Sequence, residues 1–262
     1  MGFIGGFRLA GLGLAALCAS MVLRGDSGVT LSLQVPASVA RQAPPTILWA
    51  WEEPEDLRTV DPERVGVAFL AERVFLGETA QISPRRQSIL VPDRVFAIAV
   101  VRIESTPGFA DSSKLRAEAA DAVLRAAELP NIRGVQIDFD AAASQREFYA
   151  EVLRQVRSRL PAQMGLTMTA LLSWCASSDG WLRNLPVDAA VPMYFRLGKH
   201  SGQWGVQESR CAGNVGISID EPGRAQARVG ARRYVFSPRP WTVGQLAVLN
   251  REGYPGIARS TP

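Results

Sequence analysis

The 262-residue sequence contains little histidine, little cysteine and little excess charge, and each shortage excludes a class of protein or site. Its single histidine, His200, excludes sites that need two, such as H-E-x-x-H. Three cysteines are too few for a four-cysteine zinc site. The net charge is only +4, with 29 basic and 25 acidic residues, and the basic residues are spread along the chain. Nucleic-acid binding is therefore not indicated.

Several ligand-binding and catalytic motifs are also missing. No strand-like run is followed by G-x-G-x-x-G or G-x-x-x-x-G-K-[ST], and no D-x-[DN]-x-[DN]-G calcium loop occurs. A serine triad would need His200 together with Asp220, but no G-x-S-x-G motif supplies the nucleophile, so we expect His200 to be solvated. The sequence predicts neither a cofactor nor a metal ion.

Residues 1–23 have the pattern of a targeting segment. Arg8 precedes an apolar run of 15 residues, 9–23, which is shorter than the about 20 residues of a spanning helix. We expect cleavage after Ser20. One alternative is that the segment is retained and anchors the chain in the membrane. The other is lipidation at Cys18, which the preceding Leu17 disfavours. In each case the rest of the chain is expected to be exported, periplasmic or anchored facing the periplasm.

The rest of the chain divides into a linker, one domain and a tail. Residues 24–45 contain three prolines and read as a linker, 46–256 as a single domain, and 257–262 as a tail. Export would make Cys175 and Cys211 candidates for a disulfide. The predicted strands place them at opposite ends of the domain, however, so we expect them to be unpaired.

Short apolar runs rich in β-branched and aromatic residues recur through the domain. Helical patterns cover 113–129, with Ser112 or Ser113 as N-cap, 144–160, with Ser144 and Glu147 as a capping box, and 241–251, with Thr242 as N-cap. Strands separated by helices form parallel β-α-β units. The runs are 47–52, 65–75, 95–104, 134–140, 165–174, 189–195, 215–220 and 233–237.

Eight such strands predict an α/β fold, a compact (β/α)8 TIM-like barrel, rather than the alternative of a doubly wound open sheet. The connections 77–94, 196–214 and 221–232 lack a clear helical pattern, so we expect the barrel to be partly eroded there.

The fourth run, Q-I-D-F-D, shows which residues face the barrel axis. Val135, Ile137 and Phe139 alternate with polar residues and should meet the helices, so Gln136, Asp138 and Asp140 should point inward. Arg102, on the neighbouring strand, is the expected cation partner of Asp138. The alternative is that this ion pair only fills the barrel interior.

Polar residues collect where the predicted strands end, which is where barrel enzymes place their chemistry. A ring of carboxylates suits glycoside hydrolysis, which needs an acid and a nucleophile or base. Tryptophan faces suit sugar stacking; we expect Trp49 to pack in mid-strand and Trp174 to belong to the site. The predicted catalytic residues are Asp138, Asp140, Glu104 and Asp220. The predicted substrate-binding residues are Glu52, Arg102, Gln136, Trp174, Tyr194, Arg196 and Glu221.

Several segments resemble a bacterial family without an assigned activity, domain of unknown function family 3142. They span nearly the whole chain after residue 46. The segments are ILWAWEEPEDLR (47–58), GVQIDFDAAASQREFY (134–149), ALLSWC (170–175), LPVDAAVPMYFRLG (185–198), SIDEPG (218–223) and YVFSPRPWT (234–242).

The chain is more loosely similar to the chitinase-like barrels of glycoside hydrolase family 18. Their fourth strand ends in D-x-x-D-x-D-x-E, and the last Glu is the acid. Asp138 and Asp140 match the two aspartates, but Ala142 stands at the position of the acid. The mechanism that this resemblance implies would need a proton from another strand.

Two functions follow. The first is an exported glycosidase of an envelope or extracellular glycan, with Asp140 as nucleophile or base and Glu104 or Asp220 as acid. The second is a non-catalytic barrel that binds a glycan or an envelope partner through the same mouth.

Overall fold

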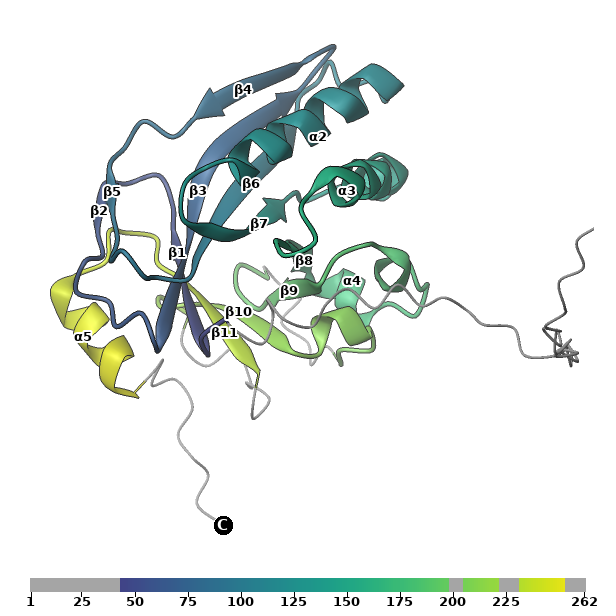
Figure 1. Ribbon diagram of the computed structural model, residues 1–262. Helices are drawn as coiled ribbons and strands as arrows, with labels where there is room; N and C mark the ends of the chain where they lie inside the picture. The colour runs from purple at the N-terminus through teal and green to yellow at the C-terminus, as the bar shows by residue number, and fades with distance from the viewer. Residues whose placement is uncertain (1–42, 198–204, 222–230, 253–262) are drawn as a thin grey trace, which may run out of the picture. The chain divides into compact units, whose positions relative to one another are not determined.

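The computed structural model describes residues 43–197, 205–221 and 231–252 (Figure 1). Three predicted segments and the single histidine lie outside these residues: the targeting segment 1–23, most of the linker 24–45, the tail 257–262 and His200. None of the described helices combines the length and the apolar composition that crossing a membrane requires.

Eight parallel strands close into a barrel, so the TIM-like α/β fold is confirmed and the open sheet is wrong. The strands follow one another around the barrel in chain order, and the last pairs with the first. They are β1 (Thr46–Ala50), β3 (Val65–Leu76), β6 (Ala97–Ser105), β7 (Ile132–Asp138), β8 (Gly165–Leu171), β9 (Ala189–Met193), β10 (Asn214–Ser218) and β11 (Arg232–Phe236).

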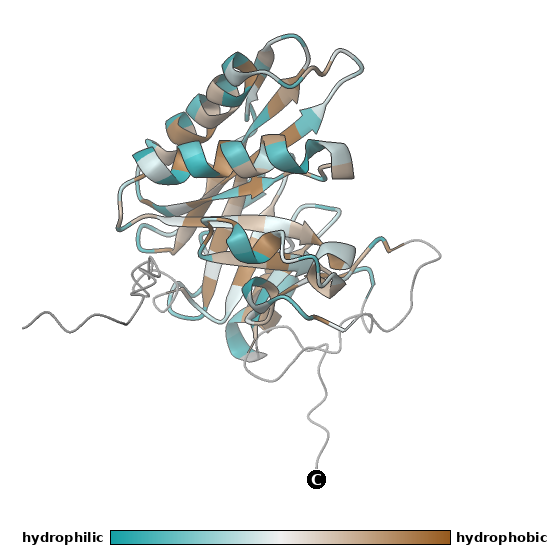
Figure 2. Ribbon diagram, turned by 90° about the vertical axis from the view of Figure 1, so that its right-hand side faces the viewer, coloured by the Kyte–Doolittle hydropathy of each residue, from teal (hydrophilic) through white to brown (hydrophobic). Residues whose placement is uncertain are grey.

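Three longer helices follow strands, close to the predicted positions: α2 (Ser113–Ala127), α3 (Arg146–Arg159) and α5 (Val243–Glu252). Ser112 caps α2, because its Oγ accepts from the amide of Leu115 at 3.1 Å. Thr242 and Gln245 cap α5 reciprocally. Polar and apolar residues alternate along the helices in Figure 2, as expected of helices with one face on a sheet.

The capping box expected at the start of α3 is wrong. A short 3-10 turn, η1 (Ala143–Gln145), precedes the helix, and the Gln145 side chain accepts from the amide of Ala142 at 2.8 Å. This turn occupies the position where Ser144 would have had to act as the cap.

The erosion of the barrel is confirmed in the connections that the structure describes. Between β3 and β6 the chain forms β4 (Ala80–Pro84), antiparallel to β3, and β5 (Ile89–Leu90), which pairs with β2 (Glu55–Asp56). After β8 come a short helix, α4 (Leu172–Ala176), and η2 (Leu182–Asn184); η3 (Ser209–Cys211) precedes β10. The predicted strand 165–174 thus ends early, and its last residues are helical.

The buried residues form two clusters, one on each side of the barrel wall. The outer cluster joins the strands to the helices and contains Leu115, Phe148 and Val156. The inner cluster fills the barrel and contains Trp49, Ile98, Val100 and Tyr234, among others. A barrel filled in this way leaves space for a ligand only near its ends.

A bulge in β3 changes which of its residues face the axis. The pairing of β3 with β6 shifts between Leu70 and Glu72, so Leu70 pairs with Val100 but Glu72 pairs with Val101. Val100 belongs to the inner cluster and Val101 to the outer one. The extra residue, Ala71, therefore turns Glu72 outward and Arg73 inward, as β-bulges generally re-aim side chains.

Cys175 and Cys211 form a disulfide, with Cα atoms 5.9 Å apart, so the prediction that they are unpaired is wrong. Cys175 lies in α4, which turns outward after β8 rather than staying at the top of the strand, and Cys211 lies in η3 directly before β10. The amides of Gln207 and Glu208 donate to the carbonyl of Cys175 at 2.8 and 3.1 Å, which lays this segment against α4.

We expect the disulfide to stabilise the barrel, because it closes a loop whose ends are 36 residues apart in a region with little helix. The double variant Cys175→Ser/Cys211→Ser should lose about 2–4 kcal/mol of unfolding free energy, as loops of this size typically do. Urea unfolding of the oxidised protein and the variant measures the difference. Equal stability of the two proteins would contradict the prediction.

Candidate functional site

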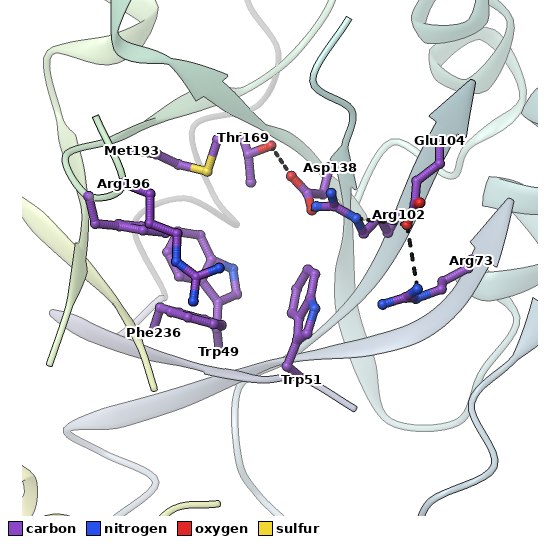
Figure 3. Close-up of a pocket in the computed structure, with 11 residues that line it drawn as sticks. Trp49, Trp51, Arg73, Arg102, Glu104, Asp138, Thr169, Met193, Arg196 and Phe236 are labelled. Carbon is purple, nitrogen blue, oxygen red and sulfur yellow. Dashed lines mark hydrogen bonds and ion pairs between the residues drawn. The ribbon is translucent and has the colours of Figure 1, made fainter. Parts of the chain in front are cut away.

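A cavity of about 350 Å³ opens where the carboxyl ends of the strands meet (Figure 3). Its lining is charged on one side, along β3, β6 and β7, and aromatic on the other, along β1, β9 and β11. The charged residues are Arg73, Arg102, Glu104, Asp138 and Arg196; the others are Trp49, Trp51, Thr169, Met193, Phe195 and Phe236.

Asp138 lies at the base of the charged side and is almost fully buried. Asp138 and Arg102 are paired in register on β7 and β6, and Arg102 Nη1 is 2.6 Å from Asp138 Oδ2. Thr169 Oγ1 donates to the other carboxylate oxygen at 2.7 Å. The expected pairing and the inward orientation of Asp138 are confirmed, and both oxygens are occupied.

Glu104 lies two residues farther along β6, nearer the mouth. Its Oε1 is 3.0 Å from Arg102 Nε and 3.6 Å from Arg73 Nη1. Arg73 also forms an ion pair with Glu52, which is half exposed at the rim. Both guanidinium contacts go to one oxygen of Glu104, and the described residues offer no hydrogen-bond donor to Oε2.

Asp140 stands at the rim, half exposed, with Oδ2 3.8 Å from Arg102 Nη2. Partial desolvation raises the pKa of Asp140, the negative charge of Asp138 raises it further, and Arg102 opposes both effects. Arg102 therefore touches Asp138, Asp140 and Glu104, and the Asp140 carboxyl holds a proton to higher pH than an ordinary aspartic acid because its pKa is raised.

The aromatic side is built around Trp49 and Trp51 on the first strand and the residue after it. Trp49 is buried, and its Nε1 donates to Gln136 Oε1 at 2.8 Å. Gly216 leaves space for this ring, since a Cβ there would lie 2.9 Å from Trp49 Cη2. Trp51 is only half buried and packs edge-on against Phe236. Trp51 thus offers the more accessible face to a ligand.

The structure places other predicted substrate-binding residues away from the cavity. Trp174 requires a correction: it lies in α4, outside the barrel wall, and packs against Trp181 with ring centroids 5.1 Å apart. The early end of β8 causes this, because the chain turns outward before Trp174. Tyr194 packs against the outer cluster, and Gln136 is buried below the cavity.

Two predicted acids lie near other walls of the mouth. Asp220 is exposed and accepts a hydrogen bond from Ser218. It follows β10, which lies opposite β6 in the strand order, so it does not share the charged side with Glu104. Glu221 accepts from the backbone amide of Arg196 at 3.1 and 3.3 Å and thereby holds the loop after β9.

Sequence reasoning missed Arg73, Thr169, Met193, Phe195 and Phe236 as cavity residues. Arg73 lies inside the 65–75 run, where the simple alternation of the strand gave no reason to choose it, and the bulge at Ala71 decides its direction. Phe195 and Phe236 stack with centroids 5.5 Å apart. Their positions at the carboxyl ends of β9 and β11 could have indicated from the sequence that they belong to the site.

The family model with the description "Domain of unknown function (DUF3142)" matches residues 93–189. This part of the chain resembles that family. The matched stretch includes the charged residues at the ends of β6 and β7, which are Arg102, Glu104, Asp138 and Asp140. It does not include Arg73, which lies on β3. No curated protein matches the chain.

One solved structure confirms the likeness to chitinase-like barrels at the level of the fold. A protein assigned as chitinase A of Streptomyces coelicolor superposes with a TM-score of 0.50 at 11% identity, over 73% of this chain and 91% of that one. The spore cortex-lytic enzyme SleL of Bacillus cereus gives a TM-score of 0.44 at 16% identity over 66% of this chain. This chain spans half of the length of SleL.

Ala142, at the position of the chitinase-like acid, is exposed next to η1. Its methyl group can transfer no proton. The described carboxyl groups at this mouth include those that contact Arg102, together with Glu52, Asp220 and Glu221.

Proposed function

We propose that this protein is an exported glycoside hydrolase that acts on an envelope or extracellular glycan bound in the cavity. The observation that carries the proposal is that Asp140 and Glu104 contact the same guanidinium group at the mouth of a barrel lined by aromatic rings. Because both touch Arg102, their oxygens are no farther apart than the about 9.5 Å that glycosidases use at most.

Their environments suggest different roles. The pKa of Asp140 is raised, chiefly by desolvation, which suits a general acid that protonates the leaving oxygen. Both arginine contacts of Glu104 are to Oε1, and an Oε2 without a described donor suits a base or nucleophile. This assignment exchanges the roles expected from the sequence, where Asp140 was the nucleophile or base. Asp138, with both oxygens bonded, acts as a positioning residue for Arg102.

Trp51 is the proposed platform for a sugar ring. Its half-buried face borders the cavity, and Arg102 lies 6.0 Å from the ring centroid, so a ring stacked on Trp51 lies beside the reacting carboxyl groups. Flat apolar faces and a few polar groups are what sugar-binding pockets provide.

A second function, glycan binding without hydrolysis, is favoured by one observation. Ala142 removes the acid of the chitinase-like motif, and Glu104, Asp138 and Asp140 are all in contact with Arg102. A site of this kind would hold the same ligand and leave its bonds intact.

Hydrolysis and binding can be tested together. We expect wild-type protein incubated with a panel of envelope and plant polysaccharides to release new reducing ends, and Glu104→Gln to lose this activity. Trp51→Ala should weaken binding roughly 10-fold, about 1.4 kcal/mol, through lost stacking. The control is Asp121→Asn, whose carboxylate pairs with Arg159 on the outer surface. Binding without release of reducing ends from any substrate would favour the second function. The absence of both binding and hydrolysis would reject both proposed functions.

Export is proposed from residues 1–23 alone, and it is tested separately. N-terminal sequencing of protein recovered from cell fractions should find a chain that starts after Ser20 in the periplasm. Intact chain in the cytoplasm would contradict export.

A further inference from the structure

Of the three arginines that line the cavity, two form ion pairs with described carboxylates and the third, Arg196, does not. Arg73 and Arg102 face Glu104 and Asp138 and are joined to them by ion pairs. Arg196 also lines the cavity, but no described carboxylate lies within ion-pair distance of its guanidinium group. The Arg196 guanidinium therefore remains available to a ligand, at the aromatic end of the cavity.

The Arg196 guanidinium is held in place by its neighbours. Its central carbon lies 5.2 Å from the centroid of the Phe236 ring, and that ring is stacked on Phe195. An arginine that lies against an aromatic face keeps its N–H donors available in the plane of the group. Figure 3 shows this side chain across the cavity from Arg102 and Glu104, with Trp51 between them.

The backbone at Arg196 supports a functional role. Its φ is 55°, in the left-handed region that side chains with a Cβ rarely adopt. The Glu221 carboxylate accepts from the Arg196 amide and fixes this conformation. Strained backbone of this kind is found at ligand-binding positions more often than elsewhere.

From these observations we infer that the substrate is an acidic glycan, and that Arg196 binds a carboxylate on a sugar placed beside the one that stacks on Trp51. The inference rests on the proposed function and specifies its substrate class. Arginine suits this task because its planar fork donates to both oxygens of a carboxylate. The carboxylate could belong to a uronic acid in the polysaccharide backbone or to an acidic substituent on a sugar.

Matched pairs of polysaccharides test the inference. Polygalacturonate and its methyl ester differ in the charge of the backbone carboxyl group, and peptide-free peptidoglycan strands, intact and carboxyl-reduced, differ in the substituent carboxyl group. We expect the full chain to bind one acidic form at least about 10-fold more tightly than its neutral partner, because hydrogen bonds between charged groups contribute that much. The preference should weaken as salt increases.

Variants of Arg196 test whether this residue causes the preference for acidic over neutral glycans. Arg196→Gln should remove most of the difference between acidic and neutral forms, because it weakens binding of the acidic form more than binding of the neutral form. Arg196→Lys should keep only part of the preference, because the lysine ammonium group cannot donate two parallel hydrogen bonds to a carboxylate as a guanidinium group can. Arg133→Gln is the matched control, since Arg133 is exposed at the amino end of β7 and borders a small cavity at the opposite end of the barrel.

The outcomes separate this inference from the proposed function. Acidic preference that depends on Arg196, with no new reducing ends, would uphold the inference for a binding protein and reject hydrolysis. Hydrolysis of neutral and acidic glycans at equal rates in wild type and Arg196→Gln would uphold hydrolysis and overturn the inference. Equal binding of acidic and neutral forms by the wild type would also overturn it.

Discussion

Asp140→Asn should reduce glycan hydrolysis by about 100- to 10,000-fold while ligand binding stays nearly intact, because it removes a general acid and keeps the shape of the side chain. The rate of reducing-end release, measured under saturating and limiting substrate, gives this loss as a change in kcat. Asp121→Asn should keep full activity, since it makes the same chemical change on the outer face of α2. Activity unchanged in Asp140→Asn would reject the assignment of this residue.

The pH dependence gives a second measurement on Asp140. Its pKa is raised above the ordinary value of 3.8, first by desolvation, so the acid stays protonated to higher pH than an ordinary aspartic acid. We expect kcat/KM to fall as pH rises through this pKa, and Asp140→Asn to lack that alkaline limb.

Stability should respond to the protonation of Asp140 in the same sense as activity, since both decrease as pH rises through its pKa. Because the folded pKa is raised, the stabilisation linked to the proton is complete at low pH and is lost as pH rises through the folded pKa. At neutral pH, Asp140→Asn should therefore unfold at the same urea concentration as the wild type or at a slightly higher one. A variant that is inactive because it is unfolded would fail this check.

Arg102→Met should destabilise the barrel by about 3–5 kcal/mol, because it leaves the buried Asp138 carboxylate without its cation. The side chain of Asp138 is only 4% exposed, and Thr169 would remain its one hydrogen-bond partner. Glu104 and Asp140 would lose a shared contact as well. Urea unfolding measures the loss, and the midpoint should move with little change in slope.

The double variant Arg102→Met/Asp138→Asn distinguishes an unpaired charge from lost packing. Removing the charge of Asp138 should recover a large part of the stability that Arg102→Met loses, since the amide can be buried at lower cost. Arg154→Met is a suitable control, because Arg154 pairs with Glu147 and Glu151 on the exposed side of α3. A loss under about 1 kcal/mol in Arg102→Met, as for exposed pairs, would contradict the prediction.

The sequence determined the features that depend on local alternation and local caps. In β7, apolar residues at every second position require that Val135 and Ile137 face the helices and Asp138 face the axis, because only the inward side of a barrel strand can place polar groups at a site. Ser112 and Thr242 cap their helices through residues three positions away, so their roles too were visible without the fold.

Only the tertiary structure decided the features that depend on a shift in register or on the path of a connection. The bulge at Ala71 is set by pairing with β6, and it turns Arg73 toward Glu104. The end of β8 at Leu171 sends Trp174 outside the barrel, and the segment after β9 brings Cys211 to Cys175. One inserted residue exchanges the inward and outward faces of a strand, and one early turn places a side chain on the other side of the barrel wall. Contacts between residues distant in the chain determine both features. The hydrophobic periodicity of the sequence therefore cannot predict them.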